Sequence, residues 1–285
     1  MTTIAVCEPR YYEVSYRINP WMDPTGWQAA RTELAIQAQT QWHELKRSLK
    51  RLGANLCEIQ PQKGVPDMVF MANSAVVHNG KALLSRFRYP ERRREEPFFE
   101  SFFSKLVDAG SLKDMQKLSD GMVLEGAGDC IWDEARELFW CGFGPRSDRR
   151  SATMIEDYFE RPTVSLELID ERYYHMDTCL MPLSGGDVIY FPGAFSPADL
   201  EEIYVHVPEE KRIAVSEADA QTLAVNGVNL GVHYLTGSCG GHLEAQLAER
   251  GYQVHNVDLS AFKKSGGSAF CLTLRLDCGS AGRLE

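Results

Sequence analysis

Residues 75–84 read AVVHNGKALL, in which two short apolar segments, 75–77 and 82–84, flank the dipeptide Asn79-Gly80. Asparagine followed by glycine supplies the positive backbone angles of a two-residue turn, so this stretch predicts a tight antiparallel hairpin. Consecutive strands of a doubly wound parallel sheet need a crossover connection, which ten residues cannot provide. The stretch therefore indicates an α/β fold other than a plain parallel sheet.

Short strands and amphipathic helices alternate on both sides of this hairpin. In residues 27–52, for example, apolar side chains recur at steps of three and four, which is the period of a helix with one buried face. Helices are expected at 27–52, 95–109, 151–159, 197–203, 217–224 and 242–250, and further strands at 4–7, 55–59, 164–168, 188–191, 213–215, 229–234, 254–257 and 272–276.

No run of Gly, Ser or Pro resembles a linker between domains. Residues 1–277 are therefore expected to form a single domain, a size that can bury a substantial core. The polar segment 278–285 is expected to be a frayed tail, and its final Leu-Glu is consistent with an expression-vector remnant.

Composition excludes several classes of protein. With 44% hydrophobic and 25% charged residues, the chain has the profile of a soluble globular protein rather than a disordered one. No segment reaches the roughly eighteen apolar residues of a membrane span. The balance of 30 Lys and Arg against 40 Asp and Glu gives a net charge of −10, which disfavours nucleic acid as a partner. No nucleotide-binding motif, GxGxxG after the first strand or GxxxxGK[ST] anywhere, is present.

The cysteines indicate a reducing compartment. The sequence MTTIAVCEPR at residues 1–10 lacks the basic and apolar regions of a secretory leader, so we expect a cytoplasmic protein with reduced thiols. No two cysteines form a CxxC pair, which argues against a zinc-ribbon or thioredoxin-like site. The eight are Cys7, Cys57, Cys130, Cys141, Cys179, Cys239, Cys271 and Cys278.

Four polar clusters lie beside predicted strand ends and could carry chemistry. Together they supply a thiol, an imidazole and several carboxylates, which suits nucleophilic catalysis on a cationic substrate. If residues 174–177 were a strand, His175 and Asp177 would face the same side, as an acid/base and a cation anchor require. The clusters are PDMVFMAN (66–73), LEGAGD (124–129), YHMD (174–177) and SGGSAFC (265–271).

Each of these residues also has a simpler explanation. Cys271 opens an apolar strand, where free cysteines commonly serve as small packing groups. A lone histidine such as His175 is more often structural than catalytic, and Glu125 could belong to a turn. Arg146 lies in a Gly- and Pro-containing segment where a guanidinium could hold a carboxylate with two hydrogen bonds.

Taken in order, the clusters resemble the guanidino-group-modifying superfamily, which includes arginine deiminases, dimethylarginine dimethylaminohydrolases and amidinotransferases. The similarity is greatest to the catalytic domain of arginine dihydrolases and extends from Arg17 to Arg275. It implies a pentein fold, a five-bladed α/β propeller of ββαβ-type modules, over residues 1–277. The motifs that carry it are RINPWM (17–22), PDMVFMAN, LSRFRYPERRREEPFF (84–99), LEGAGD, LIDERYYHMDTC (168–179), PLSGG (182–186), VNGVN (225–229) and GGSAFCLTLR (266–275).

The resemblance assigns roles to the polar residues. Cys271 would attack the guanidinium carbon, His175 would be the general acid/base, and Glu125 would orient His175 and hold guanidinium nitrogens. Asp177 would pair with the guanidinium, and two arginines would hold the α-carboxylate of L-arginine. No metal or cofactor is implied. The expected substrate-binding residues are Asp177, Arg92, Arg146, Asn19, Asp67 and Asp129.

Asn73 distinguishes between the possible activities. Deiminases and dimethylaminohydrolases usually carry aspartate at this position, beside the guanidinium. A neutral amide both donates and accepts hydrogen bonds, so it can hold a ureido group as well as a guanidinium. Asn73 is therefore counted with the catalytic residues, and the expected products are ornithine, two ammonia and carbon dioxide.

Several alternatives stay open at this point. A deiminase that releases citrulline, a dimethylarginine dimethylaminohydrolase or an amidinotransferase would use the same cysteine adduct. A noncatalytic pentein would act as a binding module, but such proteins lack the cysteine and histidine pair. Known dihydrolases continue into an ornithine-processing domain, and this chain ends before one. A homo-oligomer is compatible with the sequence.

Overall fold

The hairpin at residues 75–84 forms as predicted in the computed structural model, which describes residues 2–279. Strands β3 (Ala75–His78) and β4 (Lys81–Leu84) pair antiparallel, and the turn residues Asn79 and Gly80 have φ angles of 51° and 78°. The chain then passes through helices α3 (Pro90–Arg93) and α4 (Glu96–Asp108). It returns as β5 (Asp114–Lys117), parallel to β4. The result is one ββαβ unit.

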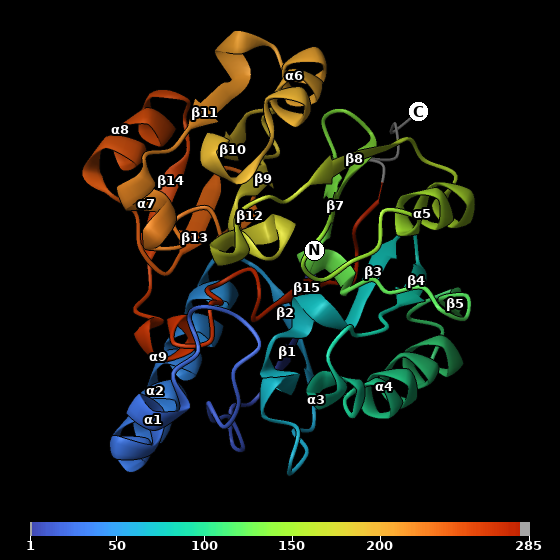
Figure 1. Ribbon diagram of the computed structural model, residues 1–285, viewed down its shortest axis with the longest axis vertical. Coiled ribbons are helices and arrows are strands. Elements are labelled where there is room, and N and C mark those ends of the chain that lie inside the picture. Colours follow the sequence, from blue (N-terminus) through green and yellow to red (C-terminus); the bar gives the residue numbers. More distant parts are fainter. Residues whose placement is uncertain (1, 280–285) are drawn as a thin grey trace.

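This ββαβ unit occurs five times. Each sheet has three strands, with one antiparallel and one parallel pairing. Figure 1 shows the five sheets arranged around a common centre. The next three blades are β6 (Cys130–Asp133), β7 (Leu138–Phe143), α5 (Ser151–Phe159) and β8 (Thr163–Glu167); β9 (Leu180–Pro182), β10 (Val188–Tyr190), α6 (Pro197–His206) and β11 (Arg212–Ala214); and β12 (Val228–Leu230), β13 (His233–Thr236), α8 (Gly241–Glu249) and β14 (Gln253–Asn256).

The fifth blade joins the two ends of the chain and closes the ring. Strand β15 (Leu274–Arg275) pairs antiparallel with β1 (Thr3–Cys7), and β1 pairs in parallel with β2 (Asn55–Ile59) after helix α2 (Arg31–Arg51). The α/β class and the five-bladed propeller are thereby confirmed.

The first strand of each antiparallel pair faces the propeller axis. Contacts between blades join β3 to β6 and β6 to β9, and one pocket on the axis is lined from all five of these strands. We call β3, β6, β9, β12 and β15 the inner strands. Short 3₁₀ turns precede three of them: η1 (Pro66–Val69) and η2 (Met71–Ser74), η3 (Gly126–Gly128), and η5 (Met176–Thr178).

Two predicted strands differ from the structure. The single strand expected at 229–234 is instead a hairpin, in which residues 231–232 form the turn between β12 and β13. The Asn229 side-chain amide donates to the carbonyls of Gly231 and His233 and closes that turn. The strand expected at 272–276 is reduced to Leu274–Arg275. The backbone N–H of Leu272 donates to the carbonyl of Ser268, which holds the preceding segment in a turn.

Other boundaries changed less. The helix expected at 27–52 is divided into α1 (Pro24–Ala29) and α2 at Ala30, whose backbone leaves helical geometry. Strands β5, β6, β7 and β9 were not predicted. The remaining short elements are α7 (Glu217–Gln221), α9 (Ser260–Lys263), η4 (Glu171–Tyr173), η6 (Pro192–Ala194) and η7 (Glu209–Lys211).

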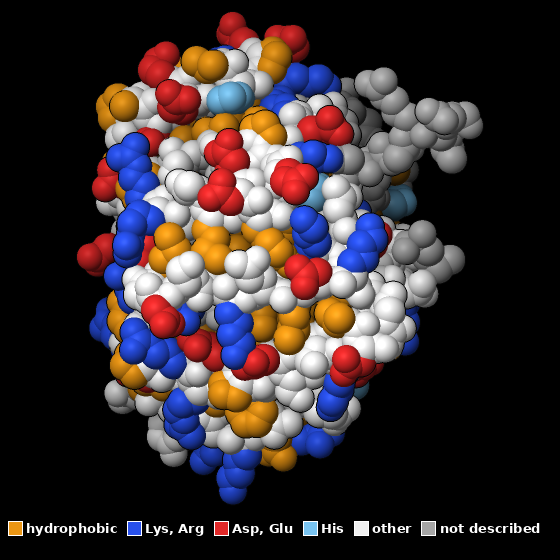
Figure 2. All heavy atoms as spheres, turned by 90° about the vertical axis from the view of Figure 1, so that its right-hand side faces the viewer, with side chains coloured by type: hydrophobic (Ala, Val, Ile, Leu, Met, Phe, Trp, Pro, Cys, Tyr) orange, Lys and Arg blue, Asp and Glu red, His pale blue; other side chains and the backbone are white. Residues whose placement is uncertain are grey.

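Figure 2 shows acidic and basic side chains interspersed over one face of the molecule. Within residues 2–279, no helix is long and apolar enough to cross a membrane. Most of the expected frayed tail, residues 280–285, lies outside the described residues. Its first residue, Cys278, accepts a hydrogen bond from the backbone N–H of Asn79 at 2.7 Å.

Candidate active site

The segments that precede the five inner strands meet at one end of the propeller axis. Each brings buried polar side chains to this end, although the segments are far apart in the sequence. The turns and loops leave strand geometry here, so adjacent residues point in different directions. Asn73 precedes β3, Glu125 and Asp129 precede β6, His175 and Asp177 precede β9, Asn226 precedes β12, and Cys271 precedes β15.

The thiol of Cys271 is buried, with 2% of the residue exposed, and has two polar contacts. Its Sγ donates to Asp177 Oδ2 at 3.0 Å and accepts from Asn226 Nδ2 at 3.2 Å. Burial, reinforced by the Asp177 carboxylate, raises the pKa of the Cys271 thiol well above its ordinary value. Burial also raises the pKa of Asp177, to about 7. Without a cation beside it the thiol is therefore protonated, and a bound cation would favour the thiolate.

His175 forms a buried pair with Glu125. Its Nε2 lies 2.8 Å from Glu125 Oε2. Burial opposes ionisation of Glu125, but Arg146 and His175 outweigh it and hold the pKa of Glu125 below its ordinary value. Burial lowers the pKa of His175 to about 4, against the opposing effect of Glu125. With an ionised carboxylate on Nε2, the neutral imidazole carries its proton there, which leaves Nδ1 as the basic nitrogen.

Residues 174–177 do not form a strand, the condition under which His175 and Asp177 would face the same side. Residues 176–178 form the 3₁₀ turn η5, with His175 as the residue before it. The two side chains therefore diverge: His175 contacts Glu125, whereas Asp177 contacts Cys271. The turn η5 thus directs His175, the expected acid/base, and Asp177, the partner of the Cys271 thiol, to different places in the site.

Arg146 and Arg92 both border the catalytic pocket, and both already have carboxylate partners. Arg146 donates to Glu125 at 2.9 Å and to the carbonyl of Ile18 at 3.0 Å. Arg92 donates twice to Glu95, at 3.0 and 2.8 Å, and also to Asn73 and to the Asp67 carbonyl. Among the described residues, Arg146 therefore has more N–H groups available for a substrate carboxylate than Arg92 has.

Asn73 is held in one orientation at the pocket. Its Oδ1 accepts from Arg92 at 2.8 Å, and its Nδ2 donates to the carbonyl of Glu125 at 3.2 Å. The LEGAGD turn packs directly against it: a Cβ at Gly128 would lie 2.2 Å from Asn73 Nδ2. Glycine at position 128 is thus needed for the close approach of the two segments.

Two carboxylate oxygens at this site have no hydrogen-bond partner among residues 2–279. Asp67 Oδ2 accepts from Tyr16, and Asp177 Oδ2 accepts from Cys271, but the Oδ1 atom of each is buried without a partner. Burial raises the pKa of Asp67, and Arg92 opposes this effect. Since buried polar atoms are normally satisfied, these two oxygens are positions for donors on a ligand.

Asn19 and Asp129 occupy different positions. Asn19 lines the pocket, with its side chain tied to the Ser265 carbonyl and to the Trp21 N–H. Asp129 lies behind His175, where it accepts from the Met176 N–H and the Ser147 hydroxyl. Asp129 therefore holds the surrounding turns and does not line the pocket, whereas Asn19, Asp67, Arg92 and Arg146 do.

The catalytic pocket is a small enclosed cavity with an open groove above it. Four residues border both, so they separate the nucleophile from the outside: Ile18, Asn19, Arg146 and Tyr174. The rest of the pocket is lined by Asp67, Phe70, Asn73, Arg92, Ser265 and Cys271.

The sequence reasoning gave no role to two residues of this site. Asn226 is fully buried, donates to Cys271 Sγ and to the Asp177 carbonyl, and accepts from the Ser268 and Cys271 N–H groups. Tyr174 stacks over the Arg146 guanidinium at 4.6 Å. The signal for Asn226 was the VNGVN motif, and Tyr174 is adjacent to His175.

Within residues 2–279, no three His, Cys, Asp or Glu side chains are grouped so that they could hold a metal ion. The polar groups of the site are thus carboxylates, guanidinium groups, amides, one imidazole and one thiol. That set recognises a cation with several N–H donors and supplies a nucleophile beside it.

A propeller of five ββαβ blades with a thiol, an imidazole and carboxylates at one end of its axis defines the guanidino-group-modifying penteins. Within this class, the chain belongs to the dimethylarginine dimethylaminohydrolase family. The model of that family, described as "N,N dimethylarginine dimethylhydrolase, eukaryotic", matches residues 17–277. The resemblance inferred from the motifs is confirmed.

Similar proteins of this class fall into two groups. The bifunctional arginine dihydrolase/ornithine cyclodeaminase ArgZ of Synechocystis is 39% identical over 273 residues, which are 96% of this chain but 37% of ArgZ. The N(G),N(G)-dimethylarginine dimethylaminohydrolase of Mycobacterium tuberculosis is 36% identical over 95% of this chain and 85% of the relative. The chain therefore spans little more than a third of the length of ArgZ.

A solved structure covers the same region. The N-terminal domain of the cyanobacterial arginine dihydrolase ArgZ, a Cys-to-Ser variant bound to substrate, has a TM-score of 0.91 and 36% identity to this chain. The match covers 99% of this chain and 100% of that domain.

Proposed function

We propose that the protein hydrolyses the guanidino group of free L-arginine to ornithine, two ammonia and carbon dioxide. The observation that carries this proposal is the pair of buried, unpartnered Oδ1 atoms on Asp67 and Asp177, beside the Cys271 thiol. A planar guanidinium offers N–H donors in several directions, which can satisfy both oxygens. It also carries a positive charge, which pairs with the carboxylates and favours the thiolate.

The first step is attack of the Cys271 thiolate on the guanidinium carbon. The positive charge of the substrate next to Asp177 and Cys271 favours the thiolate. The thiol proton passes first to Asp177, its hydrogen-bond acceptor, and then to His175 Nδ1, where the Glu125 carboxylate stabilises the imidazolium. The proton then goes to the departing nitrogen. The carbon–sulfur bond forms and the carbon–nitrogen bond breaks. Ammonia departs, and an amidino-thioether on Cys271 remains.

The second step is hydrolysis of the thioether. His175 removes a proton from water, the hydroxide adds to the carbon, and the thiolate of Cys271 leaves and recovers the proton. The product is a ureido group, as in citrulline. A further round on this group expels a second ammonia and yields a carbamate, which separates into the ornithine amine and carbon dioxide. Two waters are consumed in total.

Asn73 is the reason for favouring two rounds over one. An aspartate here would place a further carboxylate beside the guanidinium and would favour a cation over the neutral ureido group. The amide of Asn73 binds Arg92 and the Glu125 carbonyl without adding charge. The similarity to ArgZ, named as an arginine dihydrolase, supports the same assignment.

The test is a product balance with purified protein and L-arginine. We expect two ammonia per ornithine and no accumulation of citrulline, and we expect Asn73→Asp to shift the products toward citrulline with one ammonia. Citrulline as the final product of the unmodified protein would replace the proposal with a deiminase. Transfer of the amidino group to added glycine or lysine would replace it with an amidinotransferase.

A second candidate substrate is Nω-methylated arginine. It is favoured by the family model and by the mycobacterial relative, which covers most of its own length. The same adduct would then expel dimethylamine in place of ammonia. Asymmetric dimethylarginine should be assayed beside arginine, and a kcat/KM higher than that for arginine, with dimethylamine released, would establish this candidate.

We also propose that residues 1–277 form a single catalytic domain in the cytoplasm. The closure of the ring by β15 and β1 supports one domain, and the eight free cysteines support a reducing compartment. Limited proteolysis should leave residues 1–277 intact, and the protein should unfold in one transition in the presence of reductant.

A further inference from the structure

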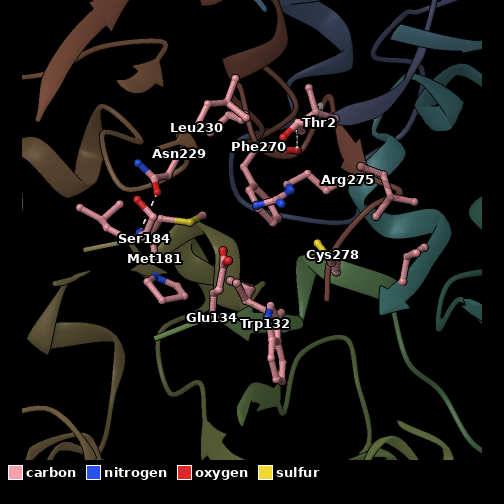
Figure 3. A pocket seen from close by; sticks show the side chains of 18 of the residues that line it. Thr2, Trp132, Glu134, Met181, Ser184, Asn229, Leu230, Phe270, Arg275 and Cys278 are labelled. Carbon is pink, nitrogen blue, oxygen red and sulfur yellow. Dashed lines mark hydrogen bonds between the residues drawn. The ribbon is translucent and has the colours of Figure 1, made fainter. Parts of the chain in front are cut away.

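A second pocket lies on the propeller axis at the end opposite to the catalytic pocket. The catalytic residues precede the inner strands, whereas all five inner strands themselves contribute to the lining of this pocket. We call it the axial pocket; its volume is about 420 Å³. Figure 3 shows it from close by. The lining residues that matter for its chemistry are Trp132, Glu134, Met181, Leu230, Phe270 and Arg275.

Two opposite charges face each other across the axial pocket. Arg275 is on β15 and Glu134 follows β6, and Figure 3 shows the guanidinium and the carboxylate directed toward one another. They do not form an ion pair within 4.0 Å. The one ion pair of Arg275 with a described residue is a 3.5 Å contact with Asp277. Both charges therefore retain hydrogen-bonding capacity for a ligand between them.

The walls between these charges are largely apolar. Met181, Leu230, Phe270 and Trp132 line the pocket from four different blades. The polar side chain of Asn229 is already bonded to Ser184 N–H at 2.8 Å. An apolar cavity with one cationic and one anionic group at its edge is the pattern of a site for a small amphiphilic ligand.

We propose that the axial pocket binds a free α-amino acid with an apolar side chain. Its carboxylate would pair with Arg275, its ammonium with Glu134, and its side chain would pack against Met181 and Leu230. A dicarboxylate would be repelled by Glu134, and a diamine by Arg275. A zwitterion satisfies both groups at once, and the volume is sufficient for a side chain of the size of methionine or phenylalanine.

The axial pocket is close to the nucleophile in sequence but separate from it. Phe270 lines the axial pocket, and the next residue, Cys271, lines the catalytic pocket. A binding experiment must therefore keep ligand out of the catalytic pocket. Saturating ornithine, the proposed product, occupies that pocket in the native protein. Alkylation of Cys271 with iodoacetamide in a Cys278→Ala variant, which lacks the thiol that lines the axial pocket, provides a second means that does not depend on the proposed function.

The test is calorimetric titration of the full chain with L-methionine, L-leucine and L-phenylalanine. We expect at least one of them to bind with the catalytic pocket blocked by either means. Affinity should fall at least tenfold in Arg275→Gln and in Glu134→Gln, and N-acetylmethionine and methionine amide should each bind at least tenfold more weakly than methionine. The kcat/KM for arginine in both variants should stay within twofold of the unmodified protein.

Three outcomes would overturn the proposal: no binding by any of the three amino acids at millimolar concentration, affinity unchanged in both variants, or equal binding of glutarate. Glu134 is exposed, so Glu134→Gln is expected to fold even if Arg275→Gln does not. That variant alone can then decide the role of the carboxylate.

Discussion

The two ends of the propeller axis hold charge in different ways. At the catalytic end, Arg92 and Arg146 are buried and already paired with Glu95 and Glu125. At the other end, Arg275 and Glu134 face each other across a cavity without forming an ion pair. The catalytic end is thus preorganised, since its groups are fixed before a substrate arrives.

The difference follows from the local backbone at each end. The catalytic end is built from turns before the inner strands, where successive side chains such as His175 and Asp177 diverge toward different partners. The axial pocket is lined from the strands themselves, whose side chains alternate between two faces. Turns can thus concentrate unlike polar groups around one thiol, whereas strands supply mostly apolar walls.

The largest expected effect separates Cys271 from the other thiols. Cys271→Ala removes the nucleophile, so kcat for arginine should fall by at least about a thousandfold, while arginine binding stays measurable by calorimetry. Cys57→Ala is the matched control, because Cys57 is a half-buried thiol on β2. Turnover of Cys271→Ala at the rate of the unmodified protein would contradict the covalent mechanism.

A smaller effect on turnover is expected at Asn226, which lies in the loop that precedes β12 and positions the nucleophile. Asn226→Ala removes the amide that donates to Sγ and that receives the Ser268 and Cys271 N–H groups. We expect kcat to fall about 10- to 100-fold. The pH profile of Cys271 alkylation should also move to higher pH, because the thiolate loses a donor.

Asn229 provides the comparison for Asn226, because it lies three residues further along and lines the axial pocket. Asn229→Ala removes hydrogen bonds that close the β12–β13 turn, so it should lower stability slightly and leave the alkylation profile unchanged. If the pH profile of Cys271 alkylation is the same in Asn226→Ala and in the unmodified protein, the role of Asn226 is structural only.

Much of this site could be predicted from the sequence, because its residues lie in short ordered motifs. Cys271, Asn73 and Arg146 border one pocket although about 200 residues separate the first two. The hairpin at 75–84 was also predictable, since the Asn-Gly turn is a local property of the chain.

Other features depend on tertiary contacts that a periodic pattern does not contain. The strand at 180–182 has three residues, which is too short for an alternation to be recognised. The separation of His175 and Asp177 depends on the turn η5, and the position of Asp129 behind His175 depends on how η3 and η5 pack. The opposition of Glu134 and Arg275 requires the ring to close, so no local motif could indicate it.

A further effect expected at the catalytic end concerns stability rather than turnover. Burial raises the pKa of Asp177 to about 7 in the native protein, compared with about 3.9 in an unfolded chain. Between these two pH values Asp177 is ionised in the unfolded state but stays protonated in the native state. The native protein therefore loses stability as the pH rises from about 4 to about 7. The Asp177→Asn variant has no carboxyl group at this position and so lacks this loss. The pH dependence that comes from His175 is present in both proteins and cancels in their difference. The stability of Asp177→Asn relative to the unmodified protein should therefore increase over this range, by about 1 to 4 kcal/mol. Urea unfolding at pH 4.5 and 7.5 in the absence of arginine measures the difference, and a decrease would mean that Asp177 is ionised in the native protein at low pH.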